Sequence, residues 1–306
     1  MNASTLSISP SAITPLKHRR IQWSDCPSKK QDWLLPESMI YYMAKNPSSA
    51  KCYQKLIQSC KYFFEKNPIL IVANIGISKD RVSTLICSNE FNECKNMIEK
   101  CCIKIDISKI SSKIWLIRDL DIISDIEDYI SMLCSKLFRC EINYFGIMGM
   151  FVKFEDFKCM ASTAKKITSW DNKITFNDGK PVKLDEILEC LLNVEEFDFV
   201  FGYNTSLVNA STMANIMKLK NCENLKTFKL TFIPESLNLN DLSDFLKKYK
   251  DTKIWLVFEY DISQGYKDEL DELIDEIIED GIPDRVITYE GQDVEKERYM
   301  KSRYNF

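Results

Sequence analysis

The sequence predicts an α/β protein in which a short N-terminal helical hairpin precedes a stack of helix–strand units with a curved, mostly parallel sheet. From about residue 184 onward, amphipathic helical segments alternate with short runs rich in β-branched and aromatic residues. The centres of four such runs, Phe199, Leu230, Leu256 and Ile287, follow one another at 31, 26 and 31 residues. A unit of this length cannot close its own core, so neighbouring units must cover one another. A doubly wound domain would show the same alternation, but the short steps and the similar strands favour the stack.

Residues 1–31 are rich in Ser, Pro and basic side chains and poor in apolar ones. Such a composition buries too little apolar surface to fold, so we expect a disordered basic tail. Its basic cluster, KHRR, comes last in the segment, which is the reverse of a secretory signal. No apolar run in the chain approaches the ~18 residues that span a bilayer. We therefore expect a cytoplasmic or nuclear protein with no membrane partner.

Residues 32–68 have the pattern of two short helices. The stretch LPESMIYYMA reads as one helix with Pro36 in its first turn, where the missing N–H matters little. Asn46 before Pro47 is a typical start for a second helix. Its apolar residues have three-and-four spacing on one face: Ala50, Tyr53, Leu56, Ile57, Cys60 and Phe63 or Phe64. Pro68 ends the pattern, which gives a helical hairpin.

Residues 69–306 change to strand-like runs. ILIVANIGI reads as a buried strand, and CIKIDI, KIWLI and EINYFGI suggest further strands. An amphipathic helix runs through Ile126, Ile130, Leu133 and Leu137, and ITFNDGKPV carries an Asp-Gly turn signal.

The last 125 residues repeat a helix followed by a strand. The four strand runs are EFDFVF, LKTFKLTF, TKIWLVFE and RVITYE. The apolar positions of the preceding helices are Leu184, Ile187, Leu188 and Leu191; Met213, Ile216 and Met217; Leu242, Phe245, Leu246 and Tyr249; and Leu270, Leu273, Ile274, Ile277 and Ile278. Gly281 follows the last helix as a C-cap signal.

Charge is unevenly distributed along the chain. Residues 1–70 hold ten Lys or Arg against four Asp or Glu, whereas the rest hold 31 against 41. A protein that is acidic over most of its length is a poor binder of nucleic acid. The twelve cysteines are scattered without a CxxC pair, which is typical of buried free thiols rather than of disulfides or zinc sites.

The sequence shows no arrangement of residues that is typical of a catalytic site. The single histidine, His18, lies in the expected tail, and only eight glycines occur, so a phosphate-binding loop is not expected. The acidic side chains of residues 268–279 fall opposite the leucines and isoleucines, as on a solvated helix face. We therefore expect no enzyme activity, no catalytic residues, no cofactor and no metal, and the long surface of a stack favours protein binding.

The N-terminal stretch resembles an F-box. The motif opens with a Leu-Pro turn and a Glu, for which Leu35, Pro36 and Glu37 stand, and an aliphatic residue, Ile40, follows. It closes with an apolar residue, a Cys, a basic residue and a large aromatic. Leu56 or Ile57, Cys60, Lys61, and Phe63 or Phe64 occupy those places. The motif followed by irregular β/α units is similar to the F-box-like families expanded in nematodes. The strict leucine-rich pattern, with Asn or Cys at its turn, is missing, so residues 69–306 resemble an irregular leucine-rich-like array.

The resemblance implies a substrate-recognition subunit of a cullin–RING ubiquitin ligase. The hairpin would bind a Skp-type adaptor through Leu35, Pro36, Ile40, Leu56, Cys60, Phe63 and Phe64, and the repeats of residues 69–306 would bind an unknown protein substrate. The alternative is a stand-alone protein-binding scaffold whose N-terminal helices only cover the first repeat, because solenoids need such caps.

Overall fold

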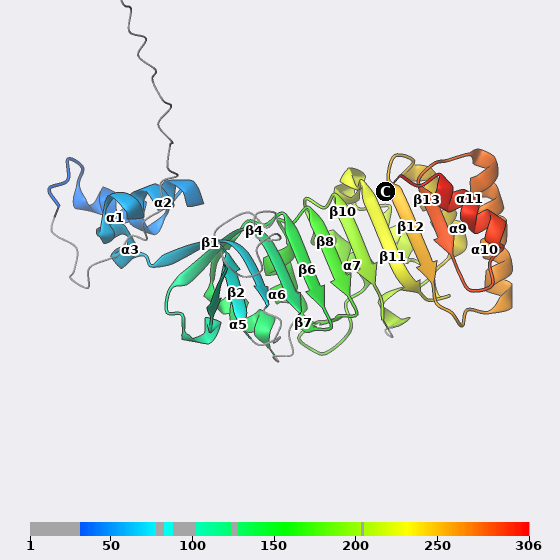
Figure 1. Cartoon of the computed structure of the whole chain (residues 1–306), viewed down its shortest axis with the longest axis horizontal. Helices are drawn as coiled ribbons and strands as arrows, with labels where there is room; N and C mark the ends of the chain where they lie inside the picture. Colours follow the sequence, from blue (N-terminus) through cyan, green and yellow to red (C-terminus); the bar gives the residue numbers. More distant parts are fainter. Residues whose placement is uncertain (1–30, 78–82, 88–101, 124–127, 203–204, 306) are drawn as a thin grey trace, which may run out of the picture.

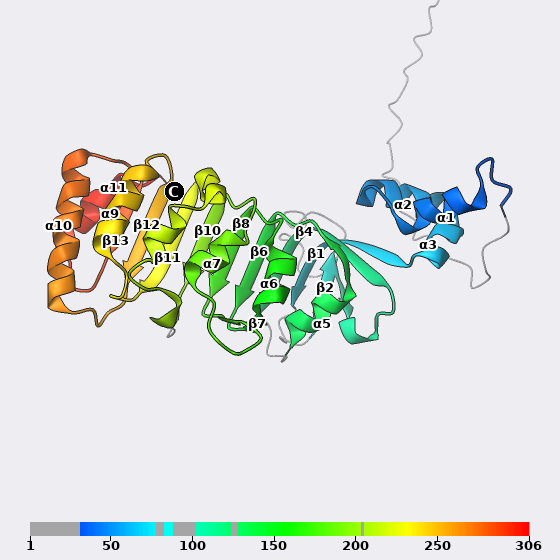
Figure 2. The same ribbon diagram turned by 180° about the vertical axis from the view of Figure 1, so that it is seen from behind.

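The computed structural model describes residues 31–77, 83–87, 102–123, 128–202 and 205–305. It is an elongated, mixed α/β molecule whose main feature is an eleven-stranded, mostly parallel sheet. Three helices lie at the N-terminal end of the sheet (Figure 1). Seen from behind, α5, α6, α7 and α9 lie in front of the strands, so they cover one face of the sheet (Figure 2). The predicted α/β class and the mostly parallel sheet are confirmed.

Helices and strands alternate along most of the described chain. The α-helices are α1 (Glu37–Lys45), α2 (Ala50–Ser59), α3 (Lys61–Lys66), α5 (Tyr129–Lys136), α6 (Phe154–Ala161), α7 (Leu184–Glu189), α8 (Thr212–Ile216), α9 (Leu239–Lys248), α10 (Gln264–Asp280) and α11 (Val294–Ser302). The strands of the large sheet are β1 (Ile69–Ile77), β2 (Thr84–Cys87), β3 (Cys102–Ile105), β4 (Lys113–Ile123), β5 (Leu137–Cys140), β6 (Tyr144–Met148), β8 (Lys166–Trp170), β10 (Glu196–Val200), β11 (Thr227–Ile233), β12 (Lys253–Phe258) and β13 (Arg285–Thr288). A separate parallel pair consists of β7 (Phe151–Lys153) and β9 (Lys173–Thr175).

The order of the strands follows the chain over most of the sheet. From β4 through β6, β8, β10, β11 and β12 to β13, each strand pairs in parallel with the next. The order turns once, at β1, which lies between β4 and β2, and β2 and β3 extend the sheet as antiparallel strands. Over most of the sheet, therefore, the strands lie side by side in the order in which they occur in the sequence.

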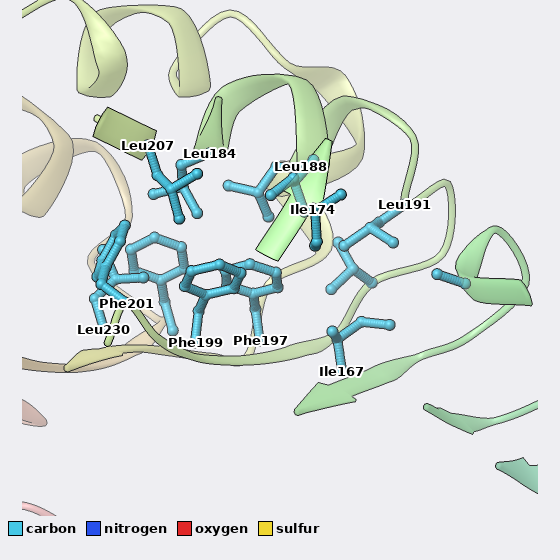
Figure 3. Close-up of a cluster of buried hydrophobic side chains, with 14 of the residues drawn as sticks. Ile167, Ile174, Leu184, Leu188, Leu191, Phe197, Phe199, Phe201, Leu207 and Leu230 are labelled. Carbon is cyan, nitrogen blue, oxygen red and sulfur yellow. The ribbon is translucent and has the colours of Figure 1, made fainter. Parts of the chain in front are cut away.

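The main core lies between the sheet and the helices on its covered face. Strand alternation turns Phe197 and Phe199 of β10 toward Leu184 and Leu188 of α7, as Figure 3 shows. The ring of Phe197 also stacks on Phe228 of the next strand, with centroids 5.8 Å apart. Each side chain buried in this way contributes about 1.5–3 kcal/mol, so the core links every unit to the next.

The predicted elements of residues 69–306 are found with shifted ends. The strand ILIVANIGI is β1, and the helix expected through Ile130 and Leu133 is α5. Ile126 lies outside the described residues, and Leu137 begins β5 instead of ending the helix. The Asp-Gly turn is present, because Gly179 has φ +83° and its N–H bonds to the Phe176 carbonyl at 3.0 Å.

One turn of the sheet carries a buried asparagine, although the strict leucine-rich pattern is missing from the sequence. Asn172, at the turn after β8, is 4% exposed, and its Oδ1 accepts from the Met150 N–H at 2.9 Å. Its Nδ2 donates to the Ile147 carbonyl at 2.9 Å and to the Ser169 hydroxyl at 3.0 Å. A buried amide satisfied in this way ties the turn after β8 to the turn after β6.

The N-terminal segment has three helices instead of the two predicted. The second begins at Ala50, four residues after Asn46, because the Ser49 hydroxyl caps it by accepting from the Cys52 N–H at 3.2 Å. The continuous helix expected through Phe64 breaks at Cys60, which has an extended backbone. The Ser59 hydroxyl donates to the Leu56 carbonyl at 2.7 Å, and such local bonds compete with the helix ladder.

Candidate protein-binding surfaces

The turn before α1 and the helix itself expose a group of large apolar side chains. We call them the α1 patch: Leu34, Leu35, Met39, Tyr41, Tyr42 and Met43. Tyr42 is 67% exposed, Met39 51% and Leu35 45%. Scattered exposed apolar residues are normal, but six large ones within residues 34–43 are more than such scatter explains and indicate a candidate interaction surface.

A small core holds this patch in place. Ile40 and Ala44 of α1 and Phe63 of α3 are buried together, and Trp33, Leu56, Ile57, Cys60 and Tyr62 pack around them. The ring of Trp33 meets Phe63 edge-on, with centroids 5.7 Å apart. The break at Cys60 starts the separate helix from which Phe63 enters this cluster.

The structure divides the seven residues predicted to bind an adaptor. Leu35 and Pro36 are exposed at the start of α1, whereas Ile40 and Phe63 are 4% and 3% exposed and belong to the small core. Leu56, Cys60 and Phe64 are half-buried. The seven lie in one small unit, but only the first two resemble contact residues in their exposure.

Sequence reasoning missed the rest of the α1 patch. Met39, Tyr42 and Met43 follow Leu35 at helical spacing, so a second apolar stripe was present in the sequence. It was overlooked because Ile40 and Ala44 lie on the opposite, buried stripe of the same short helix.

The α2 helix joins these N-terminal helices to the sheet. Tyr53 is fully buried against Ile69 of β1 and Trp115 of β4, with Ala50, Ile57, Ile71, Ile117 and Phe138 around them. The Tyr53 hydroxyl donates to the Asn67 carbonyl and accepts from the Ile69 N–H at 3.3 Å. Burial raises the pKa of this hydroxyl. The helices are therefore packed onto the sheet, not hung from a free linker.

The face of the sheet opposite α6, α7 and α9, which we call the open face, ends in a row of mostly apolar residues. Strand register aligns one residue from each of six neighbouring strands: Ile123, Met148, Trp170, Val200, Thr231 and Val257. We call this row the edge strip. Ile123, Met148 and Trp170 are 39%, 41% and 44% exposed. With parallel strands ~4.8 Å apart, the strip is ~24 Å long.

Carboxylates lie beside the strip at its β4 end. A Cβ placed on Gly146 would lie 2.5 Å from the Tyr144 hydroxyl and 2.7 Å from Asp121 Oδ1, so these two polar groups converge over the glycine. Burial, and then the neighbouring Asp119, raise the pKa of Asp121. In the part of the chain that the structure describes, no cation pairs with the Asp121 carboxylate.

A hollow of about 580 Å³ opens at the other part of the strip, at the carboxyl ends of β8 to β12. Its lining includes Asp171, Glu259 and Asp261 together with Val200, Phe232 and Tyr260. The rings of Phe232 and Tyr260 lie 5.8 Å apart. Burial, followed by Asp261 and Glu235, raises the pKa of Glu259.

The side chains that could serve catalysis or metal binding do not form a cluster among the described residues. His18 lies outside the described residues, and within those residues no three His, Cys, Asp or Glu side chains gather in a group that could hold a metal ion. On α10 the acidic face is partly paired, because Lys247 contacts Glu276 at 2.6 Å and Lys296 contacts Asp275 at 2.6 Å. The described cysteines are free thiols, and burial raises the pKa of Cys140, Cys190 and Cys222 to about 12.

Among the described residues, none of the helices combines the length and the apolar character that crossing a membrane requires. No protein-family model matches the sequence, and no curated protein matches it significantly.

Proposed function

We propose that the protein is a substrate-recognition subunit of a cullin–RING ubiquitin ligase, built from an F-box-like N-terminal unit and an irregular leucine-rich-like array. The N-terminal unit would bind a Skp-type adaptor, and the array would bind a protein substrate. Ligase chemistry would belong to other subunits, so this chain would need no catalytic residues of its own.

The α1 patch carries the proposal. Leu35 and Pro36, which match the start of the F-box motif, are exposed beside four other large apolar side chains of α1. Ile40 and Phe63 are buried beneath them and keep the helices together. This division between a packed interior and an exposed apolar face is what a docking unit requires, since interface energy concentrates in a few anchors.

Adaptor binding tests the proposal directly. The double variant Leu35→Ala with Pro36→Ala removes the exposed part of the motif while the buried cluster stays intact. Covering a large apolar side chain contributes about 1.5–3 kcal/mol, so we expect adaptor affinity to fall tenfold or more, since each ~1.4 kcal/mol is tenfold. Co-purification and calorimetric titration with a recombinant Skp-type adaptor measure it.

Leu192→Ala with Val294→Ala is the matched control. These side chains are 64% and 61% exposed and lie outside the N-terminal helices, so the variant also loses exposed apolar surface. It should bind the adaptor like the parent, and both variants should melt like the parent. A parent protein that binds no adaptor, or a Leu35–Pro36 variant that binds undiminished, rejects the F-box assignment.

The alternative function, a stand-alone scaffold with an N-terminal cap, has one observation in its favour. Tyr53 of α2 covers Trp115 and Ile69, so the helices do shield part of the sheet. They shield its open face near β1 and β4, while β2 and β3 occupy the sheet edge beyond β1. Because the covered surface is not the edge, the cap alone does not account for the exposed α1 patch.

A further inference from the structure

The open face offers two kinds of chemistry side by side. The edge strip presents Met148 and Trp170 on adjacent, register-matched strands, both more than two-fifths exposed. Carboxylates lie on either side of Met148 and Trp170: Asp121 lies toward β4, and the acidic hollow lies toward β12. A single ligand that contacts all three places must be extended, apolar in the middle and cationic toward its ends.

The charge of the hollow decides which ligand fits. Asp171, Glu259 and Asp261 line it together with two aromatic rings, and no lysine or arginine is among its described lining residues. No hydrogen bond or ion pair of these three carboxylates occurs within the described part of the chain. A lysine or arginine side chain suits such a site twice over, through ion pairing and through contact with the faces of Phe232 and Tyr260.

We propose that the open face binds a basic peptide segment with an aromatic or large aliphatic anchor, whose apolar side chain contacts Met148 and Trp170 and whose Lys or Arg side chains reach Asp121 and the Glu259–Asp261 hollow. The inference rests on the proposed function only in naming that segment as part of the substrate; peptide binding itself requires no adaptor.

Fluorescence anisotropy with a short labelled peptide of alternating Lys and Trp, titrated with the full chain, tests the proposal. Two matched peptides replace every Lys by Glu or every Trp by Ala. We expect the Lys-Trp peptide to bind at least tenfold tighter than either, and its affinity to fall as salt is raised, because exposed charges are screened. Equal binding of all three peptides, or no binding of the Lys-Trp peptide, overturns the proposal.

Two variants locate the binding. Trp170→Ala should weaken binding of the Lys-Trp peptide at least tenfold, and Glu259→Gln with Asp261→Asn should do so with little change in shape. Glu272→Gln with Glu279→Gln removes two charges from the exposed side of α10 and serves as the control. If the control weakens binding as much as the hollow variant, the peptide senses overall charge and the site is refuted.

Two further measurements distinguish the peptide site from self-association of the chain and from the proposed adaptor binding. Self-association of the parent that Trp170→Ala abolishes would assign the strip to a second copy of the chain and overturn the peptide proposal. Adaptor titration of the same variants should match the parent. In the parent protein, peptide binding without adaptor binding rejects the proposed function alone, whereas adaptor binding without peptide binding rejects the peptide site alone.

Discussion

Tyr53→Phe tests how firmly the N-terminal helices are joined to the sheet. The substitution keeps the ring that packs on Ile69 and Trp115 and removes only the hydroxyl, which bonds to the Asn67 carbonyl and the Ile69 N–H. Leaving a buried donor unpaired costs about 1–3 kcal/mol. Each kcal/mol corresponds to about 2–4 °C in domains of roughly 150–250 residues, so we expect the melting temperature to fall by roughly 2–12 °C.

Thermal unfolding, followed by circular dichroism, measures the shift, and hydrogen exchange at the Ile69 amide reports on the bond itself. Tyr42→Phe is the matched control: Tyr42 is 67% exposed, and removing its hydroxyl should change stability by less than ~0.5 kcal/mol. If the Tyr53→Phe variant has the melting temperature of the parent and the Ile69 amide stays equally protected, the Tyr53 hydroxyl does not stabilise the contact between α2 and the sheet.

Two other predictions concern the sheet. Asn172→Ala should lower the free energy of unfolding by about 1–3 kcal/mol in urea titration, since it leaves the buried Met150 N–H without its partner; an unchanged midpoint would show that the turn tolerates the loss. Burial raises the pKa of Tyr129 and Tyr249 to about 12, above the 10.0 of a free tyrosine. The folded state therefore holds more protons than the unfolded state between those values, so stability should be full below pH 10 and fall as pH rises toward 12. Urea midpoints across this range, compared with tyrosinate absorbance, check the sign, and a midpoint that rises with pH contradicts it.

The alternation of apolar helices and strands predicted most of the C-terminal half because each element there has a clear period. The helix with Leu242 and Phe245 and the strand with Leu256 are found as α9 and β12. The last helix, α11, was missed because only Met300 of it is buried, so it shows almost no apolar stripe. Its signal was the Asp293 cap, whose carboxylate accepts from the Glu295 N–H at 2.7 Å.

The candidate surfaces were harder to predict than the fold. The N-terminal motif lies in the segment that carries the α1 patch. Which of its side chains are exposed depends on how α1, α2 and α3 pack, and periodicity in a nine-residue helix does not decide that. The edge strip could not be found at all from one sequence. Met148, Trp170 and Val200 come from three strands, and only their register places them in one row.

The packing of Tyr53 between α2 and the sheet also fixes the position of the N-terminal helices relative to the first strands. Asn67 and Pro68 alone separate α3 from β1, and Asn67 is itself bonded to Ala44 and Tyr53, which leaves no slack between the N-terminal helices and the sheet. The distance from the N-terminal helices to a point on the open face therefore increases by ~4.8 Å with each strand that lies between them. Adding or removing one strand between them would therefore change the distance from the N-terminal helices to the far end of the sheet by about that step.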